Sequence, residues 1–345
     1  MKKKVVVGLS GGVDSACAAY LLKKAGYEVI GCGIWMNEYN NFCDVEKIAY
    51  SLGIQYQIID RRELFQKEVK DYFIKTYKLG MTPNPCVKCN KYVKFKTLFD
   101  VMLDFDADFV ATGHYARVNN SKLMIAFDKT KDQSYFLYGI PKSYFEKILF
   151  PLGDYLKSNV KELSKNFSDF LAKKEESQDI CFLKGDYKKC FDSCTGDIIN
   201  DKGEVLGKHD GIFNYTIGQR KGLGVSSSEP LFVREIDTQK NTVIVATKAG
   251  VQSCKFCITS LNLLDEKFLE INNEIHGYRF KINNADIKVR YSSKPKKGDI
   301  YISEDFKFAE IHLHECESGI AKGQSTVVYI ADQVILGGII NKVFY

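Results

Sequence analysis

The sequence predicts an α/β protein in which a doubly wound parallel sheet is followed by two small β-rich domains. Apolar runs alternate with helix-like segments from the start of the chain to about residue 185. The first of these runs leads through a glycine-rich turn into a helix. Beyond residue 186, turn-forming Gly, Asp, Asn and Lys residues separate short β-like runs, a pattern typical of small sheet or barrel domains.

The first part of the chain supplies the elements of the parallel sheet. Buried strands are predicted over residues 5–7, 29–36, 54–59 and 109–112, and helices over residues 16–24, 45–52 and 64–78. Because strands and helices alternate, the strands are expected to be parallel, with a ligand at their carboxyl ends. In the later part, strands are predicted over residues 243–246, 287–291, 308–313 and 326–330. We therefore expect domains at residues 1–188, 189–250 and 251–345.

Composition and charge describe an ordinary globular protein. The 345 residues are 45% hydrophobic and 27% charged, and no run is long enough for a membrane span. The apolar run at residues 5–7 ends at Ser10, too early for a signal peptide, so a cytoplasmic location is expected. In that compartment most of the 11 cysteines are expected to be reduced thiols. The net charge of +6 permits a polyanionic partner without requiring one.

The glycine-rich turn has the sequence Gly8-Leu9-Ser10-Gly11-Gly12-Val13-Asp14-Ser15. Glycines allow the backbone to approach an anion, and the N–H groups of a helix N-terminus point at it. The turn lacks the Gly-Lys-Ser/Thr ending of the P-loop. It resembles instead the SGGxDS signature of the pyrophosphate-loop ATPases, which cleave ATP between the α and β phosphates. An ordinary strand-to-helix turn is the competing interpretation, but it does not account for two serines and an aspartate at these positions.

A second chemical feature is the segment TPNPCVKCN at residues 82–90. Its two prolines are expected to stiffen the loop and to prevent a helix there. Cys86 and Cys89 stand at C-x-x-C spacing. A thiol beside cations has a lowered pKa and a larger thiolate fraction. The flanking cations are Lys88, Lys91 and Lys94.

Three interpretations of this cysteine pair compete. A zinc site takes four ligands, and Cys254 and Cys257 form a second C-x-x-C pair, although it lies in the β-rich part. A redox dithiol is the second interpretation, but the proline-rich context is not thioredoxin-like. The third, a nucleophilic thiol near a nucleotide site, is the one we favour. Further along, Cys181 on its own is more typical of a buried structural thiol.

The chain resembles the bacterial tRNA-specific 2-thiouridylases, pyrophosphate-loop enzymes that replace O2 of the wobble uridine of tRNA with sulfur. The resemblance runs nearly end to end. It rests on collinear motifs at residues 8–15, 82–90, 111–117, 131–137, 150–153, 177–182 and 215–224. It implies an adenine nucleotide alpha hydrolase-like first domain, a small central domain and a C-terminal β-barrel, the last two gripping tRNA.

The resemblance also implies roles for single residues. Cys89 would be the catalytic nucleophile, and Cys181 would carry sulfur as a persulfide. The ATP phosphates would be held by Gly8, Leu9, Ser10, Gly11, Gly12, Val13, Asp14 and Ser15, with Met36 and Gly113 near the adenosine. The target base would lie against Asn84, Pro85 and Cys86. Contacts to tRNA would come from His114, Lys131, Asp132, Gln133, Arg290, Tyr291 and Gln324.

Cys86 departs from part of the family's pattern, because many members have aspartate there as a candidate general acid or base. With Cys89 and Cys181 it makes three candidate thiolates. Three cysteines with one open iron position suit a [4Fe–4S] cluster that binds sulfide. Persulfide relay and cluster chemistry therefore both stay open, and we favour the relay.

The implied reaction uses ATP and Mg²⁺ to adenylate the wobble uridine 34, and then transfers sulfur from the persulfide to give 2-thiouridine, AMP and pyrophosphate. The implied partners are the tRNAs for Lys, Glu and Gln and a sulfur donor, either a cysteine desulfurase or a sulfur-relay protein. A rival pyrophosphate-loop ligase or amidotransferase would share the turn without needing Cys89 and Cys181. A non-catalytic RNA-binding protein would explain the β-rich domains and the charge, but not the ATP turn.

Overall fold

The computed structural model describes residues 2–40, 42–165, 167, 181–182, 191, 194–273 and 275–345. The chain falls into two compact units. The first comprises Met1–Lys70, Cys86–Phe182 and Ala331–Val334, and the second Asp71–Pro85, Leu183–Ile330 and Ile335–Tyr345. Within the described ranges, no helix is both long and apolar enough to cross a membrane.

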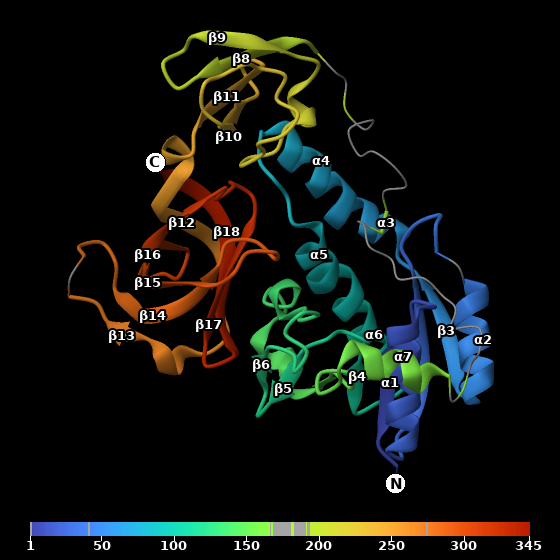
Figure 1. Ribbon diagram of the computed structural model, residues 1–345. Helices are drawn as coiled ribbons and strands as arrows, with labels where there is room; N and C mark the ends of the chain where they lie inside the picture. The colour runs from blue at the N-terminus through green and yellow to red at the C-terminus, as the bar shows by residue number, and fades with distance from the viewer. Residues whose placement is uncertain are drawn as a thin grey trace. The chain divides into compact units, whose positions relative to one another are not determined.

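A five-stranded parallel sheet with the order β3-β2-β1-β4-β7 forms the centre of the first unit. Its strands β3 and β4 are labelled in Figure 1. Its strands are β1 (Lys4–Gly8), β2 (Glu28–Trp35), β3 (Gln55–Asp60), β4 (Phe109–Ala111) and β7 (Ile148–Leu149). Val5, Val6 and Val7 are all 0% exposed, so both faces of the central strand are covered. The strand order reverses between β1 and β4. The carboxyl ends of these two strands are therefore the topological switch point, where open α/β sheets bind ligands.

The helices of the first unit confirm the predicted alternation but differ from it in two places. Its helices are α1 (Val13–Lys24), α2 (Phe42–Leu52), α3 (Arg62–Phe65), the π-helical η1 (Gln66–Lys70), α5 (Pro85–Lys88), the π-helical η2 (Cys89–Lys94), α6 (Phe95–Asp104) and α7 (Lys157–Ser164). Short elements complete it: β5 (Arg117–Asn119), β6 (Lys122–Met124), and the 3₁₀ helices η3 (Ser134–Phe136) and η4 (Lys142–Glu146). The helix predicted over residues 64–78 is divided into α3, η1 and α4 (Asp71–Lys78).

The expectation that prolines prevent a helix at residues 82–90 is wrong. Pro85 is the first residue of α5, which continues directly into η2 and α6. Proline is well tolerated at the first position of a helix, because its missing N–H would have no intrahelical partner there. The cysteine pair therefore lies on a helix that Pro85 starts.

The second unit contains two β structures. A four-stranded sheet has the order β10-β11-β8-β9, from β8 (Gly196–Asn200), β9 (Val205–His209), β10 (Leu231–Asp237) and β11 (Thr242–Thr247). Six strands then close a barrel in the order β12-β16-β15-β14-β17-β18, since β18 pairs back with β12. They are β12 (Gln252–Leu263), β14 (Phe280–Lys288), β15 (Lys296–Ile302), β16 (Phe308–Ser318), β17 (Ser325–Ile330) and β18 (Gln333–Phe344), with η6 (Ile212–Asn214), η7 (Ala249–Val251), η8 (Glu266–Phe268) and β13 (Glu270–Ile271) as short additions. The predicted fold class is confirmed, and the domain boundaries stay a prediction.

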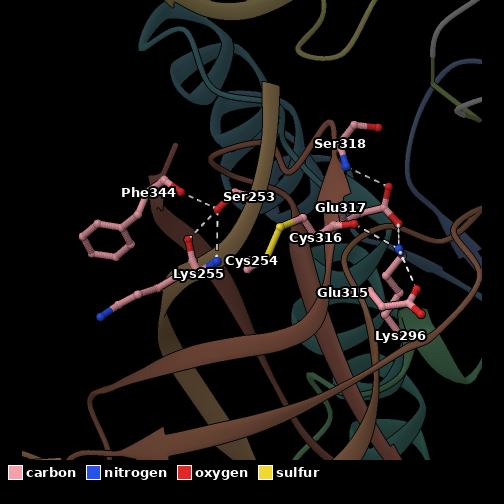
Figure 2. The surroundings of a disulfide bond; sticks show 9 residues. All are labelled: Ser253, Cys254, Lys255, Lys296, Glu315, Cys316, Glu317, Ser318 and Phe344. Atoms are coloured by element: carbon pink, nitrogen blue, oxygen red, sulfur yellow. Dashed lines mark hydrogen bonds and ion pairs between the residues drawn. A yellow bond between two sulfur atoms is a disulfide. The ribbon is translucent and has the colours of Figure 1, made fainter. Parts of the chain in front are cut away.

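A disulfide joins Cys254 of β12 to Cys316 of β16 in this barrel (Figure 2). Beside it, the Ser253 hydroxyl donates to the carbonyl oxygens of Lys255 and Phe344 at 2.8 and 2.5 Å. The disulfide withdraws Cys254 from the C-x-x-C pair that the zinc interpretation requires. Eight other cysteines among the described residues carry thiols, in line with the expectation of mostly reduced cysteines.

Candidate active site

The glycine-rich turn leaves the end of β1 and enters α1 within a few residues. Gly11 has a φ of 77°, a conformation that favours glycine. The Ser15 hydroxyl donates to the Gly12 carbonyl oxygen at 3.0 Å and accepts from the Ser10 N–H at 3.2 Å. The N-cap residue of α1 is Gly12, so no side chain caps the first N–H groups of this helix. The turn is thus held by its own serines, and it presents an uncapped helix N-terminus of the kind that binds anions.

Gly113 follows β4 and packs directly against this turn. A Cβ at this position would lie 2.6 Å from the Asp14 carbonyl carbon and 2.7 Å from the Ser15 nitrogen. Real Cβ atoms are not found so close to backbone atoms, so only glycine fits. Gly113, which was predicted to lie near the adenosine of ATP, therefore also fixes the position of the turn.

A cavity opens where β1, β2 and β4 end. It is lined by Gly8, Leu9, Ser10, Asp14, Ser15, Cys32, Ile34, Met36, Asn40, Phe42, Val45, Lys94, Leu98, Thr112, Gly113, His114 and Gln133. Seven of the ten residues predicted for ATP are among them, and Gly11, Gly12 and Val13 complete the turn. The cavity lies at the switch point of the sheet, where a nucleotide is expected.

The Asp14 carboxylate is already paired. Lys157 Nζ, at the start of α7, lies 2.6 and 2.8 Å from its two oxygens, and the Tyr115 hydroxyl donates to it at 3.0 Å. The ion pair offsets a negative charge that would otherwise repel phosphate at this point of the turn. No local sequence pattern indicates Lys157 or Tyr115, because both are more than 100 residues from Asp14 in the chain.

The loop after β2 connects the cavity to the cysteine pair. Asn40 Oδ1 accepts from the N–H groups of Met36 and Asn37 at 2.8 and 2.9 Å, which orders this loop. The Cys89 Sγ then lies 3.8 Å from the Met36 Sδ. The predicted nucleophile is therefore in contact with a residue of the cavity wall. Asn40 is a further residue that the sequence did not indicate.

Cys89 is a neutral thiol in this conformation, against the expectation of a lowered pKa. Burial raises the pKa of Cys89 to about 12, and the opposing effect of Lys94 is smaller. Desolvation also raises the pKa of Cys86, again against Lys94. The ammonium groups of Lys88 and Lys91 lie over the Tyr92 ring, 5.2 and 5.0 Å from its centroid. The number of nearby lysines in the sequence therefore does not predict the pKa of these thiols, because burial raises it by more than Lys94 lowers it.

The three residues predicted to meet the target base differ in exposure. Asn84 and Pro85 are buried, whereas Cys86 is exposed. The Asn84 amide donates to the Ser325 hydroxyl at 3.3 Å, and two residues earlier the Thr82 N–H donates to the Lys322 carbonyl oxygen at 2.8 Å. Asn84 therefore anchors its own loop, and Cys86 is the exposed member of the set.

Two of the side chains predicted to bind tRNA in the first unit are used within the protein. Asp132 is buried and accepts from the Ala126 N–H and the Ser134 hydroxyl at 2.9 and 2.7 Å. Gln133 Oε1 accepts from the Tyr115 N–H at 2.9 Å, and the residue lines the cavity. Lys131 is exposed. These contacts make the segment at residues 131–133 an anchored turn with one outward lysine.

His114 lies in the cavity wall. Burial, and then the nearby Lys94, lowers its pKa to about 3, so the imidazole is neutral at physiological pH. Its Nδ1 is 2.8 Å from the Thr112 hydroxyl.

The tRNA residues predicted in the second unit are reachable to different degrees. Arg290 and Tyr291 are exposed just after β14, and Lys288 Nζ lies 5.4 Å from the Tyr291 ring centroid. Gln324 is half-buried before β17, and its carbonyl oxygen accepts from the Ile340 N–H at 2.8 Å. A cation beside an exposed aromatic ring is suited to stacking on nucleic-acid bases.

Comparison with known proteins covers the whole chain. Family models described as the tRNA methyl transferase HUP domain, the tRNA methyl transferase PRC-barrel domain and the aminomethyltransferase beta-barrel domain match residues 3–185, 186–247 and 266–340. The chain is 37% identical to the tRNA-specific 2-thiouridylase MnmA of Clostridioides difficile, over 99% of both chains. It belongs to the tRNA-specific 2-thiouridylase family. The MnmA of Nostoc punctiforme is 36% identical, also over 99% of both chains. Among solved structures, a 4-thiouridine synthetase with RNA and bound ATP is 18% identical over 48% of this chain and 40% of that chain, with a TM-score of 0.36.

The thiols of this thiouridylase-family chain do not fit an iron–sulfur cluster as they stand. Among the described residues, no group of three or more His, Cys, Asp or Glu side chains is arranged to hold a metal ion. Cys86, Cys89 and Cys181 all interact electrostatically with Lys94.

Proposed function

We propose that this chain is a tRNA 2-thiouridylase, a sulfurtransferase that uses ATP to replace O2 of wobble uridine 34 with sulfur. The observation that carries the proposal is the Cys89 thiol in contact with Met36, at the wall of the cavity formed by the glycine-rich turn. An ATP cavity with a thiol beside it fits an enzyme that activates a base and then delivers sulfur to it. Methyl transfer, which two of the family descriptions mention, would need neither feature.

In the first step, uridine O2 attacks the α-phosphorus of ATP and pyrophosphate leaves. The turn from Gly8 to Ser15 holds the phosphates through backbone N–H groups and the α1 N-terminus. Mg²⁺ bound with ATP would neutralise part of the phosphate charge. In the turn itself, the Asp14 carboxylate is held by Lys157. The product is a uridine whose O2 carries AMP, a good leaving group.

In the second step, sulfur replaces the adenylated oxygen. The terminal sulfur of a Cys181 persulfide attacks C2, and AMP leaves with the bonding electrons. The Cys89 thiolate then attacks the Cys181 Sγ, so that 2-thiouridine is released and a Cys89–Cys181 disulfide forms. A dithiol reductant supplies two electrons to restore both thiols. Cys86 is not required in this scheme.

The substrates and partners are inferred from the resemblance to the 2-thiouridylase family. We place the reaction in the cytoplasm, on the tRNAs for Lys, Glu and Gln, with a cysteine desulfurase or sulfur-relay protein loading Cys181. His114, Lys131, Asp132, Gln133, Arg290, Tyr291 and Gln324 are proposed to contact or to position the tRNA-binding surfaces.

Thiolation of unmodified tRNA by the purified chain, with ATP and a persulfide donor, tests the function. Cys89→Ser and Cys181→Ser are expected to abolish 2-thiouridine, measured by mass spectrometry of digested tRNA. Cys194→Ser, which alters an exposed thiol of the second unit, is the control and should keep full activity. Full thiolation by Cys89→Ser would overturn the relay.

The cluster mechanism is the alternative that the sequence leaves open, because Cys86 adds a third cysteine to Cys89 and Cys181. Anaerobic purification, followed by iron and acid-labile sulfide analysis of samples assayed for thiolation, separates the two mechanisms. Near-zero iron with retained activity supports the relay. About four irons per chain, with activity that tracks them, would replace the relay by the cluster.

A further inference from the structure

Lys94 is a charged residue that the proposed steps leave without a role. It is half-buried at the end of η2, and its side chain lines the cavity together with Ser10, Ser15 and His114. Among the described residues, no carboxylate forms an ion pair with Lys94, whereas the neighbouring Lys96 pairs with Asp100 at 3.5 Å. A half-buried ammonium without a carboxylate points to an anion that is present only during the reaction.

The π-helical geometry of η2 brings Lys94 to the thiol side of the helix. In η2 (Cys89–Lys94) hydrogen bonds join residues five apart, so Cys89 and Lys94 lie one above the other. In an α-helix, five residues correspond to a rotation of about 500°, which would place the two side chains about 140° apart. π-turns are rare and are frequently found at functional sites. The local helix type therefore fixes this cysteine–lysine pair.

The other charged groups of the cavity are already neutralised. Asp14 and Lys94 are the charged residues of its lining, and Asp14 is bound to Lys157 at 2.6 Å. His114 is neutral because burial and Lys94 lower its pKa to about 3. Lys94 thus supplies the uncompensated positive charge of the cavity wall.

The groups that interact electrostatically with the Lys94 ammonium are the sulfur atoms of cysteines. Burial lowers the pKa of Lys94, but its electrostatic interactions with Cys89, Cys181 and Cys86 together raise that pKa above its usual value. The Cys89 thiolate that must form in the relay would otherwise be a buried negative charge without a partner.

We propose that Lys94 is a positioning residue whose ammonium group is the counter-charge for the sulfur anions of Cys89 and Cys181, rather than a ligand of the ATP phosphates. The inference rests on the proposed function, since the relay is what generates those anions. Phosphate is bound instead by the turn at residues 8–15, through its backbone N–H groups and the hydroxyls of Ser10 and Ser15. The lysine stabilises each sulfur anion as it forms and is not itself consumed.

Alkylation of the full chain, without ATP or tRNA, tests the inference. Rates at Cys89 and Cys181 are followed by mass spectrometry of peptides, with neutral iodoacetamide and with anionic iodoacetate. The variants are Lys94→Met, which removes the charge, Lys94→Arg, which retains it, and Lys91→Met, a matched control for a lysine that lies over Tyr92. ATP affinity of each variant is measured by calorimetry.

Lys94→Met is expected to slow alkylation at both cysteines by at least about tenfold, because the thiolate is the reacting form. Lys94→Arg should restore most of the rate, and Lys91→Met should leave it unchanged. ATP affinity should stay within about threefold in all three variants. Unchanged alkylation in Lys94→Met would overturn the inference, and so would a loss of ATP affinity as the main effect.

A measurement on the wild-type chain keeps the test independent of variant folding. A cation beside a thiol favours the anionic reagent, so the iodoacetate-to-iodoacetamide rate ratio should be higher at Cys89 and Cys181 than at the exposed Cys194. Equal ratios at the three sites would overturn the inference. Since these assays contain no tRNA, failure of the thiolation assay would remove the proposed function without affecting the alkylation result.

Discussion

Replacing Gly113 with alanine should weaken ATP binding, because the added Cβ would clash with the backbone of the glycine-rich turn and not with ATP itself. The added Cβ would lie 2.6, 2.7 and 2.8 Å from the Asp14 carbonyl carbon, the Ser15 nitrogen and the Asp14 carbonyl oxygen. All three are backbone atoms at the start of α1, so relief requires the glycine-rich turn itself to move. Overpacking of this kind costs about 1–3 kcal/mol. If that cost falls on the ATP-binding conformation, the affinity drops by about 5- to 150-fold.

Calorimetric titration with ATP, paired with urea unfolding, measures where the strain appears. Gly33→Ala is the matched control, because Gly33 does not line the cavity and its Cβ would meet side-chain atoms of Ile58, Phe42 and Val45 at 3.3 Å or more. We expect Gly33→Ala to change the affinity by less than about threefold. If Gly113→Ala retained both wild-type ATP affinity and wild-type unfolding free energy, the turn would not be packed as described.

Three further predictions concern charge, pH and the disulfide. Lys157→Met should lower the free energy of unfolding by about 1–3 kcal/mol, because Asp14 loses its partner but keeps partial access to water, whereas Lys129→Met, from an exposed pair with Asp332, should cost under about 1 kcal/mol by the same urea assay. Because burial lowers the pKa of His114 from 6.5 to about 3, the unfolded chain binds this proton first as the pH falls. Stability should therefore drop by up to about 1.4 kcal/mol per pH unit below 6.5, and urea titrations of His114→Gln should lack this contribution. Reduction of Cys254–Cys316, which are 62 residues apart, should destabilise the barrel by up to about 4 kcal/mol, and a Cys254→Ser/Cys316→Ser variant that melts like the oxidised chain would contradict this.

The sheet was predictable because its signal is local. Val5, Val6 and Val7 form a continuous apolar run, which is what a strand covered on both faces requires. The turn was predictable for a similar reason, since phosphate recognition by backbone needs glycine and serine at fixed spacing. Met36 and Gly113 could be predicted only from the family resemblance, because neither a methionine nor a single glycine indicates a nucleotide site by itself.

The features that escaped prediction depend on distant contacts or on burial. The partner of Asp14 is 143 residues away in the chain, and no spacing rule connects it to Lys157. The sequence places lysines beside Cys89 but does not show that the thiol is buried, and burial dominates its pKa. The π-helical segments have no apolar repeat that separates them from an α-helix, so residues 64–78 looked like one helix.

The π-turn of η2 also constrains how this part of the chain can change in length. After it, Phe95, Leu98 and Met102 of α6 are buried at α-helical spacing. Loss of one residue between Cys89 and Lys94 would relax the turn to an ordinary α-helix and rotate the two halves by about 100° relative to each other. Either the cysteine or the buried stripe of α6 would then face the wrong way. Length variation among relatives should therefore be confined to other parts of the chain, with residues 89–94 keeping a fixed count even where their identities differ.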